Sequence, residues 1–157
     1  MNATILLDTT LTEYRKKVRL SCMDDKFIEM RQKYKPEKVK YLFIAESPPS
    51  SIDNKEVRFF YNPNSLKWDF LFNSLMEVIY PDTKRSLDKA TLLDRFKSDG
   101  FYLIDVVDFP INDLSDGDRK AIILRELPNK IKKIHELIDF SVRASISHKE
   151  TRSRPLL

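Results

Sequence analysis

The chain has 157 residues, of which 41% are hydrophobic and 11% aromatic, with only two glycines. This length is enough for one packed core but not for two, and the composition excludes an intrinsically disordered chain. The 28 Lys and Arg residues exceed the 24 Asp and Glu residues, which gives a net charge of +4. A charge this small permits a nucleic-acid partner without requiring one. We therefore expect a single domain with a mildly basic surface.

Cysteine content and hydrophobic patterning indicate the compartment. Cys22 is the only cysteine, so an intramolecular disulfide and a thiolate-rich metal site are excluded, and a reducing environment is expected. The segment from Met1 to Leu7 is followed by Asp8 and is too short for a signal peptide, and no stretch approaches the ~18 apolar residues of a membrane span. We predict a cytoplasmic protein that makes no membrane contact and uses no metal or cofactor.

The N-terminal region is predicted to be a helical arm. Thr10 and Glu13 have the spacing of a capping box that opens a helix. Apolar residues at three- and four-residue spacing form its inner face, namely Leu11, Tyr14, Val18 and Cys22. The helix is predicted to restart over 24–30, and Pro36 ends the arm.

Two apolar runs are predicted to be strands. Residues 39–45 and 101–107 are nearly continuous in apolar residues, as in strands buried on both faces of a parallel sheet. Between them lie a long loop, residues 46–64, and helices over 66–79 and 87–97. Gly100 is placed to end the second helix in a left-handed conformation. This order indicates an α/β fold with a short, mainly parallel sheet.

The C-terminal part is predicted to be helical and then polar. Residues 117–140 have helical apolar spacing, but Pro128 is expected to split them into two short helices. Residues 141–157 are rich in Ser, Arg and Lys and are predicted to form a tail. The expected organisation is one domain over residues 1–140 and a polar tail over 141–157.

Two acidic residues are candidates for chemistry. Ligands of open α/β sheets bind beyond the carboxyl ends of the strands, and Glu46 directly follows the first strand, whereas Asp105 lies inside the second. A carboxylate within a strand needs hydrogen bonds or a wet cleft. Asp105 can therefore be structural or ligand-binding, and Glu46 can point to solvent or to a ligand. Ser47 and Pro48 begin a stiff turn that could hold Glu46 against a ligand.

The loop between the first strand and the first internal helix carries three consecutive aromatic residues, Phe59, Phe60 and Tyr61. They can cover the hydrophobic core, or they can face a cleft and stack on a nucleobase, at about 1–3 kcal/mol per base. Arg58 precedes them and could reach a phosphate group. Both interpretations of the aromatic loop remain open from the sequence.

The order of these parts resembles the uracil-DNA glycosylase superfamily. In its small members the first strand ends in a motif like Gly-Glu-Ala-Pro-Gly, an aromatic residue then stacks on the extruded base, and a later strand supplies an Asn or Asp. The matching segments here are residues 45–49, which read AESPP, the aromatic loop, and residues 103–107, which read LIDVV. The resemblance covers roughly residues 38 to 140.

This resemblance implies a three-layer α/β sandwich and a DNA or nucleobase ligand. It implies that Glu46 positions or activates a water and that Asp105 reads the base or activates the water. The remaining residues that it assigns to substrate binding are Ser47, Pro48, Arg58, Phe59, Phe60 and Asp108. Hydrolysis of the N-glycosidic bond would pass through an oxocarbenium-like sugar after the nucleotide leaves the stack, and it needs no metal.

The family's later His-Pro-Ser motif has no counterpart in this chain. His135 lies in a predicted helix and His148 is followed by Lys149, so the fold is expected to be incomplete at the C-terminus. The short sheet would keep an open edge, covered by a partner chain or by self-association. Two alternatives therefore remain, a non-catalytic interaction or nucleic-acid-binding protein that retains the scaffold, and a different α/β enzyme that acts on a phosphorylated or glycosidic small molecule.

Overall fold

The computed structural model of the chain describes residues 21–50, 58–65, 69–82 and 86–150. In chain order its elements are α2 (Ser21–Lys33), β1 (Tyr41–Ala45), α3 (Phe70–Ile79), α4 (Lys89–Ser98), β2 (Phe101–Asp105) and α5 (Asp116–Glu150). The predicted α/β class is confirmed, since this part of the chain holds four helices and a parallel sheet of two strands. The capping box at Thr10 and the stripe up to Cys22 lie outside the described side chains.

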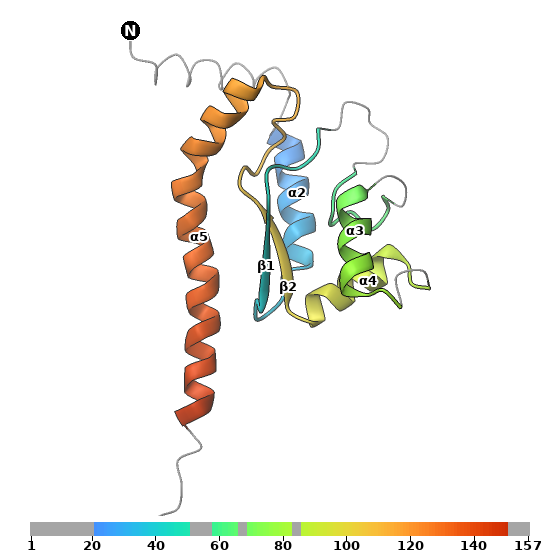
Figure 1. Cartoon of the computed structure of the whole chain (residues 1–157), viewed down its shortest axis with the longest axis vertical. Coiled ribbons are helices and arrows are strands. Elements are labelled where there is room, and N and C mark those ends of the chain that lie inside the picture. Colours follow the sequence, from blue (N-terminus) through green and yellow to red (C-terminus); the bar gives the residue numbers. More distant parts are fainter. Residues whose placement is uncertain (1–20, 51–57, 66–68, 83–85, 151–157) are drawn as a thin grey trace, which may run out of the picture.

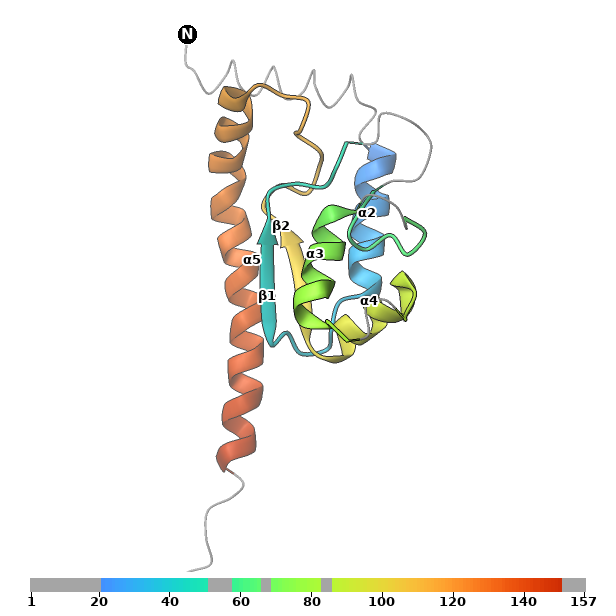
Figure 2. The same ribbon diagram turned by 45° about the vertical axis from the view of Figure 1, so that its right-hand side comes forward.

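The two strands pair in parallel and in register from end to end. Tyr41 lies opposite Phe101, and Ala45 lies opposite Asp105. A parallel pair needs a crossover connection, and α3 and α4 provide it. Figures 1 and 2 show α5 on one side of the sheet, α3 and α4 on the other, and α2 next to β2. The predicted strands are confirmed in place, although each is shorter than its apolar run.

Gly100 forms the turn between α4 and β2. Its φ of 87° is in the left-handed region that favours glycine, as predicted. A Cβ atom at this position would lie only 2.7 Å from Cγ of Lys40, and the Gly100 carbonyl accepts a hydrogen bond from the Lys40 amide at 2.8 Å. The close approach fixes the start of β2 against the chain entering β1.

The main core lies between the sheet and α2, α3 and α4. Its centre is aromatic, with the Phe60 ring centroid 4.9 Å from that of Tyr61 and 5.4 Å from those of Phe72 and Phe96. Full burial of such a side chain contributes about 1.5–3 kcal/mol. α2 contributes Phe27, which is almost fully buried. A smaller cluster of Val107, Phe109, Ile111 and Ile122 joins the segment after β2 to the start of α5.

The predicted split at Pro128 is wrong, because α5 is one helix with Pro128 inside it. Proline removes one backbone donor and disturbs the carbonyl four residues earlier, here that of Leu124. Pro128 and Leu124 are both exposed, so this carbonyl can bond to water. Ile122 and Ile134 pack against the two core clusters on either side and hold the helix in place. The helix continues to Glu150, through the first ten residues of the predicted tail.

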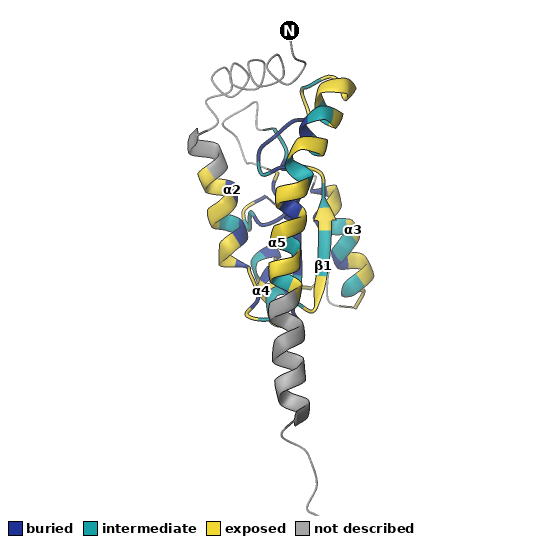
Figure 3. Cartoon of the chain, turned by 90° about the vertical axis from the view of Figure 1, so that its left-hand side faces the viewer, coloured by how far each residue is buried: buried dark blue, intermediate teal, exposed yellow. Residues whose placement is uncertain are grey.

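The outer edge of β1 has no strand partner among the described residues. Tyr41 and Ile44 of this strand are 56% and 55% exposed. Figure 3 shows β1 with partly and fully exposed residues between α5 and α3. The predicted open edge is therefore present in the described part of the chain. What covers it stays a prediction.

Candidate functional site

The carboxyl ends of β1 and β2 bring the backbones of the two predicted acids together. The Val106 amide donates to the Ala45 carbonyl at 2.8 Å, and the Val107 amide donates to the Glu46 carbonyl at 2.9 Å. The hydrogen bonds between the two segments thus continue past the last paired residue of each strand. The sequence correctly places Glu46 and Asp105 at one end of the sheet.

The side chains of the two acids nevertheless point to different partners. Since Ala45 lies opposite Asp105, the next residue, Glu46, belongs to the other face of the sheet. The exposed Glu46 carboxylate accepts hydrogen bonds from Arg119 at the start of α5, at 2.6 Å from Nη2 and 3.1 Å from Nε. Glu46 is held in a surface ion pair away from the Asp105 carboxylate.

Asp105 forms a buried ion pair with Arg31 of α2. Arg31 Nη2 donates to Oδ2 of Asp105, and both side chains are more than nine-tenths buried. Burial raises the pKa of Asp105 above its usual value, and the positive charge of Arg31 acts in the opposite direction. The carboxylate therefore has a cationic partner within the chain itself.

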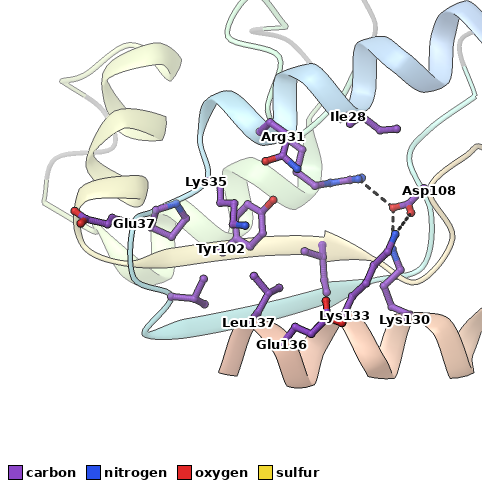
Figure 4. Close-up of a pocket in the computed structure, with 14 residues that line it drawn as sticks. Ile28, Arg31, Lys35, Glu37, Tyr102, Asp108, Lys130, Lys133, Glu136 and Leu137 are labelled. Atoms are coloured by element: carbon purple, nitrogen blue, oxygen red, sulfur yellow. Dashed lines mark hydrogen bonds and ion pairs between the residues drawn. The ribbon is translucent and has the colours of Figure 1, made fainter. Parts of the chain in front are cut away.

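Asp108 extends this pair into a network between α2 and α5. Its Oδ1 accepts from Arg31 Nη1 at 3.1 Å and from Lys130 Nζ at 2.8 Å, and Lys133 Nζ lies 3.6 Å from Oδ2 (Figure 4). Burial alone would raise the pKa of Asp108, but Lys130 and the other two cations hold it below the usual value. We call Arg31, Asp105, Asp108 and Lys130 the ion network.

The aromatic loop belongs to the core. Phe59, Phe60 and Tyr61 are 2%, 4% and 0% exposed. These rings therefore fill the hydrophobic core and do not face an open cleft. Phe59 still adjoins the ion network, because the guanidinium carbon of Arg31 lies 5.7 Å from its ring centroid. Arg58 is exposed.

The turn after Glu46 packs against the segment that follows β2. Pro48 is fully buried, and the Ser47 hydroxyl donates to Oδ1 of Asn112 at 3.0 Å. The stiffness expected from the prolines is thus supplemented by a hydrogen bond to a segment 65 residues away. Ser47 and Pro48 support the end of the sheet.

A cleft of about 530 Å³ lies between α2 and α5, across the β2 face that carries Tyr102 and Ile104 (Figure 4). Of the predicted site residues only Asp108 lines it. Sequence reasoning missed the basic residues of the cleft, Arg31, Lys35, Lys130 and Lys133. The available signal was spacing, since Ile28, Arg31 and Gln32 share one face of α2 and Lys35 follows shortly after its end.

The described residues contain no group of three or more His, Cys, Asp or Glu side chains that could hold a metal ion. Among their helices, none has both the length and the apolar character needed to cross a bilayer. Comparison with known proteins finds no matching family model, curated protein or solved structure. Fold and site thus define a small α/β protein with a buried ion network beside a cleft.

Proposed function

We propose that this chain is a uracil-DNA-glycosylase-like protein that binds DNA, or a nucleobase extruded from it, at the carboxyl ends of β1 and β2. In this proposal Asp105 reads the base and Phe59 lies beside it. The proposed scaffold is the three-layer sandwich of that superfamily.

One observation carries the proposal. The guanidinium group of Arg31 donates to the Asp105 carboxylate and lies over the Phe59 ring. A guanidinium is planar and rich in N–H donors, as is the edge of a nucleobase that carries an amino or imide group. Arg31 thus already places a flat donor between an acid and an aromatic ring. A base would replace Arg31, which would keep Asp108 as its carboxylate partner.

Basic side chains near this end of the sheet suit contacts to phosphate. Arg119 and Lys133 of α5 lie at the Glu46 and Asp108 carboxylates, and Arg58 is exposed. Cations on a protein surface bind DNA by releasing counterions, so this part of the affinity depends strongly on salt.

The ion pairs favour binding over hydrolysis. A carboxylate that activates water must be free to accept a proton, whereas Glu46 is paired with Arg119 and Asp105 with Arg31. The preferred function is therefore base or DNA binding without chemistry. Hydrolysis of an N-glycosidic bond is the second candidate, and it requires release of at least one of these two carboxylates.

The test uses fluorescently labelled oligonucleotides, single- and double-stranded, carrying uracil, hypoxanthine or no altered base. Binding is followed by anisotropy at two salt concentrations, and the same samples are then treated with alkali. We expect binding that weakens steeply with salt and is tighter for an altered base, with intact strands after alkali. Strand breaks at the altered base would establish hydrolysis instead.

Variants separate base reading from phosphate binding. Asp105→Asn should remove the preference for an altered base and keep the salt dependence, whereas Asp94→Asn on the exposed side of α4 should change neither. Circular dichroism confirms that each variant is folded. An absence of oligonucleotide binding at about 100 µM, where non-specific binders already associate, would show that the proposal is wrong.

A further inference from the structure

We infer that the cleft between α2 and α5 binds a small organic monoanion with a flat apolar body, such as an aryl carboxylate. This inference is independent of the proposed DNA binding. The cleft lies on the Tyr102 and Ile104 side of β2, and with the proposed DNA-binding region it shares Arg31, Asp108 and Lys133.

The walls of the cleft suit an apolar body. Ile28 of α2, Ile104 of β2 and Leu137 of α5 come from three separate elements and line the same space. Ile28 is 42% exposed although it faces a helix across the cleft. A volume of about 530 Å³ falls within the range of small-molecule sites. Ile104 is buried and Leu137 is half-buried. Apolar side chains from several elements that line one cleft indicate a ligand more strongly than the same residues scattered on a surface.

Two polar groups of residues that line the cleft have no hydrogen-bond partner within the part of the chain that the structure describes. Arg31 Nε is buried and has no hydrogen-bond partner among the described residues, and its two Nη atoms donate to Asp108 and Asp105. The Tyr102 side chain, which Figure 4 shows reaching into the cleft, is almost fully buried, and no hydrogen bond of its hydroxyl is found within the described residues. Buried polar groups in folded proteins are nearly always bonded. A ligand oxygen in the cleft would satisfy the Tyr102 hydroxyl, whereas Arg31 contributes its positive charge to the wall.

The charged side chains that line the cleft favour a ligand with one negative charge. Four cations and three carboxylates line the cleft. Asp108 is bonded to Arg31 and Lys130. Lys133 is 63% exposed with its Nζ at the longer distance of 3.6 Å, so it can turn toward a ligand. Glu37 and Glu136 are the remaining carboxylates of the cleft, and they disfavour a ligand that carries several negative charges inside the cleft.

Three probes of matched chemistry test the inference on the full chain. 2-Naphthoate carries both the apolar body and the charge, 2-naphthamide the body alone, and acetate the charge alone. Binding is followed by chemical-shift changes of backbone amides. We expect 2-naphthoate to shift amides of α2, β2 and α5 around residues 28–35, 102–104 and 130–137. Its dissociation constant should be below about 1 mM and at least about tenfold lower than those of the other two probes.

Substitutions locate the site. Lys133→Gln should weaken 2-naphthoate binding by up to about fivefold, whereas Lys132→Gln, an exposed neighbour outside the cleft, should leave it unchanged. Ile28→Trp should fill the cleft and abolish binding without disturbing the core, since Ile28 is partly exposed. The inference is wrong if 2-naphthoate and 2-naphthamide bind equally, or if Ile28→Trp binds 2-naphthoate like the parent chain. It is also wrong if no binding is seen at about 5 mM 2-naphthoate, well above the expected dissociation constant.

Discussion

The hydroxyl of Tyr61 hydrogen-bonds both backbone groups of Leu103, on the edge of β2 that does not pair with β1. It thus satisfies groups that a neighbouring strand would otherwise bond. It accepts from the Leu103 amide at 2.7 Å and donates to the Leu103 carbonyl at 3.0 Å. A side chain from the loop thus satisfies backbone groups that would otherwise remain unpaired in the core.

Tyr61→Phe should therefore destabilise the protein by about 2–4 kcal/mol, because two buried backbone groups lose their partner. Tyr102→Phe is the matched control, since that hydroxyl has no hydrogen-bond partner among the described residues, and its cost should stay within about 0.5 kcal/mol. Urea unfolding measures both values. Equal costs for the two variants would mean that the Tyr61 hydrogen bonds are not important for stability.

Lys89 should be a second position of high sensitivity. Its buried Nζ donates to the Phe59 carbonyl at 3.0 Å, to the Ser65 hydroxyl at 2.8 Å and to the Asp69 carboxylate at 2.6 Å. Lys89→Met would leave Asp69, which also caps α3, buried without its cation, at a cost of about 3–5 kcal/mol. Lys97→Met, which removes one exposed hydrogen bond to a carbonyl, should cost less than about 1 kcal/mol in the same unfolding experiment.

A double-mutant cycle tests the Arg31–Asp105 pair. Arg31→Met or Asp105→Leu alone leaves a buried charge without its partner and should cost about 3–5 kcal/mol. The double variant replaces the pair by apolar groups and should cost clearly less than the sum of the two single changes. Additive costs would show that the two side chains do not interact in solution.

Three buried tyrosines should resist ionisation in the folded protein. Burial raises the pKa of Tyr61, Tyr80 and Tyr102, with a hydrogen bond to Asp99 adding to the effect at Tyr80. A raised pKa in the folded state stabilises the protein fully below pH 10, the unfolded value, and this stability is lost as pH rises above it. Absorbance at 295 nm should show these three tyrosines ionising only with alkaline unfolding, and all six ionising near pH 10 in urea.

Acid should selectively weaken the ion network at Asp108. Its pKa is lowered in the folded state, so its contribution to stability is present above pH 3.8, the unfolded value, and is lost as pH falls below it. The stability difference between the parent chain and Asp108→Asn should therefore be largest at neutral pH and shrink at about pH 2. A difference that is independent of pH would contradict this assignment.

The local parts of the fold could be predicted from the sequence. The two strands follow from apolar runs, and Gly100 follows from its position after a helix, because both signals act over a few residues. Pro128 shows the limit of local rules, since packing of Ile122 and Ile134 on either side overrides the helix-breaking tendency of proline.

The site was less predictable because its partners are distant in sequence. Asp105 was recognised as a residue in need of a partner, but Arg31 lies 74 positions away and is one of 28 basic residues. No local pattern distinguishes it from the others. The aromatic loop was ambiguous for a similar reason. Rings that fill a core and rings that line a cleft have the same composition, and only the position of α2 over Phe59 decides between them.

The edge of β1 that has no strand partner among the described residues could make this protein's stability depend on its concentration. An exposed strand edge can accept a further strand, either from a second copy of the chain or from another protein. The exposed side chains of Tyr41 and Ile44 would give apolar contacts to that strand. A partner that binds only the folded state shifts the unfolding equilibrium by mass action. The midpoint of thermal unfolding would then rise with protein concentration, and dilution alone would lower it.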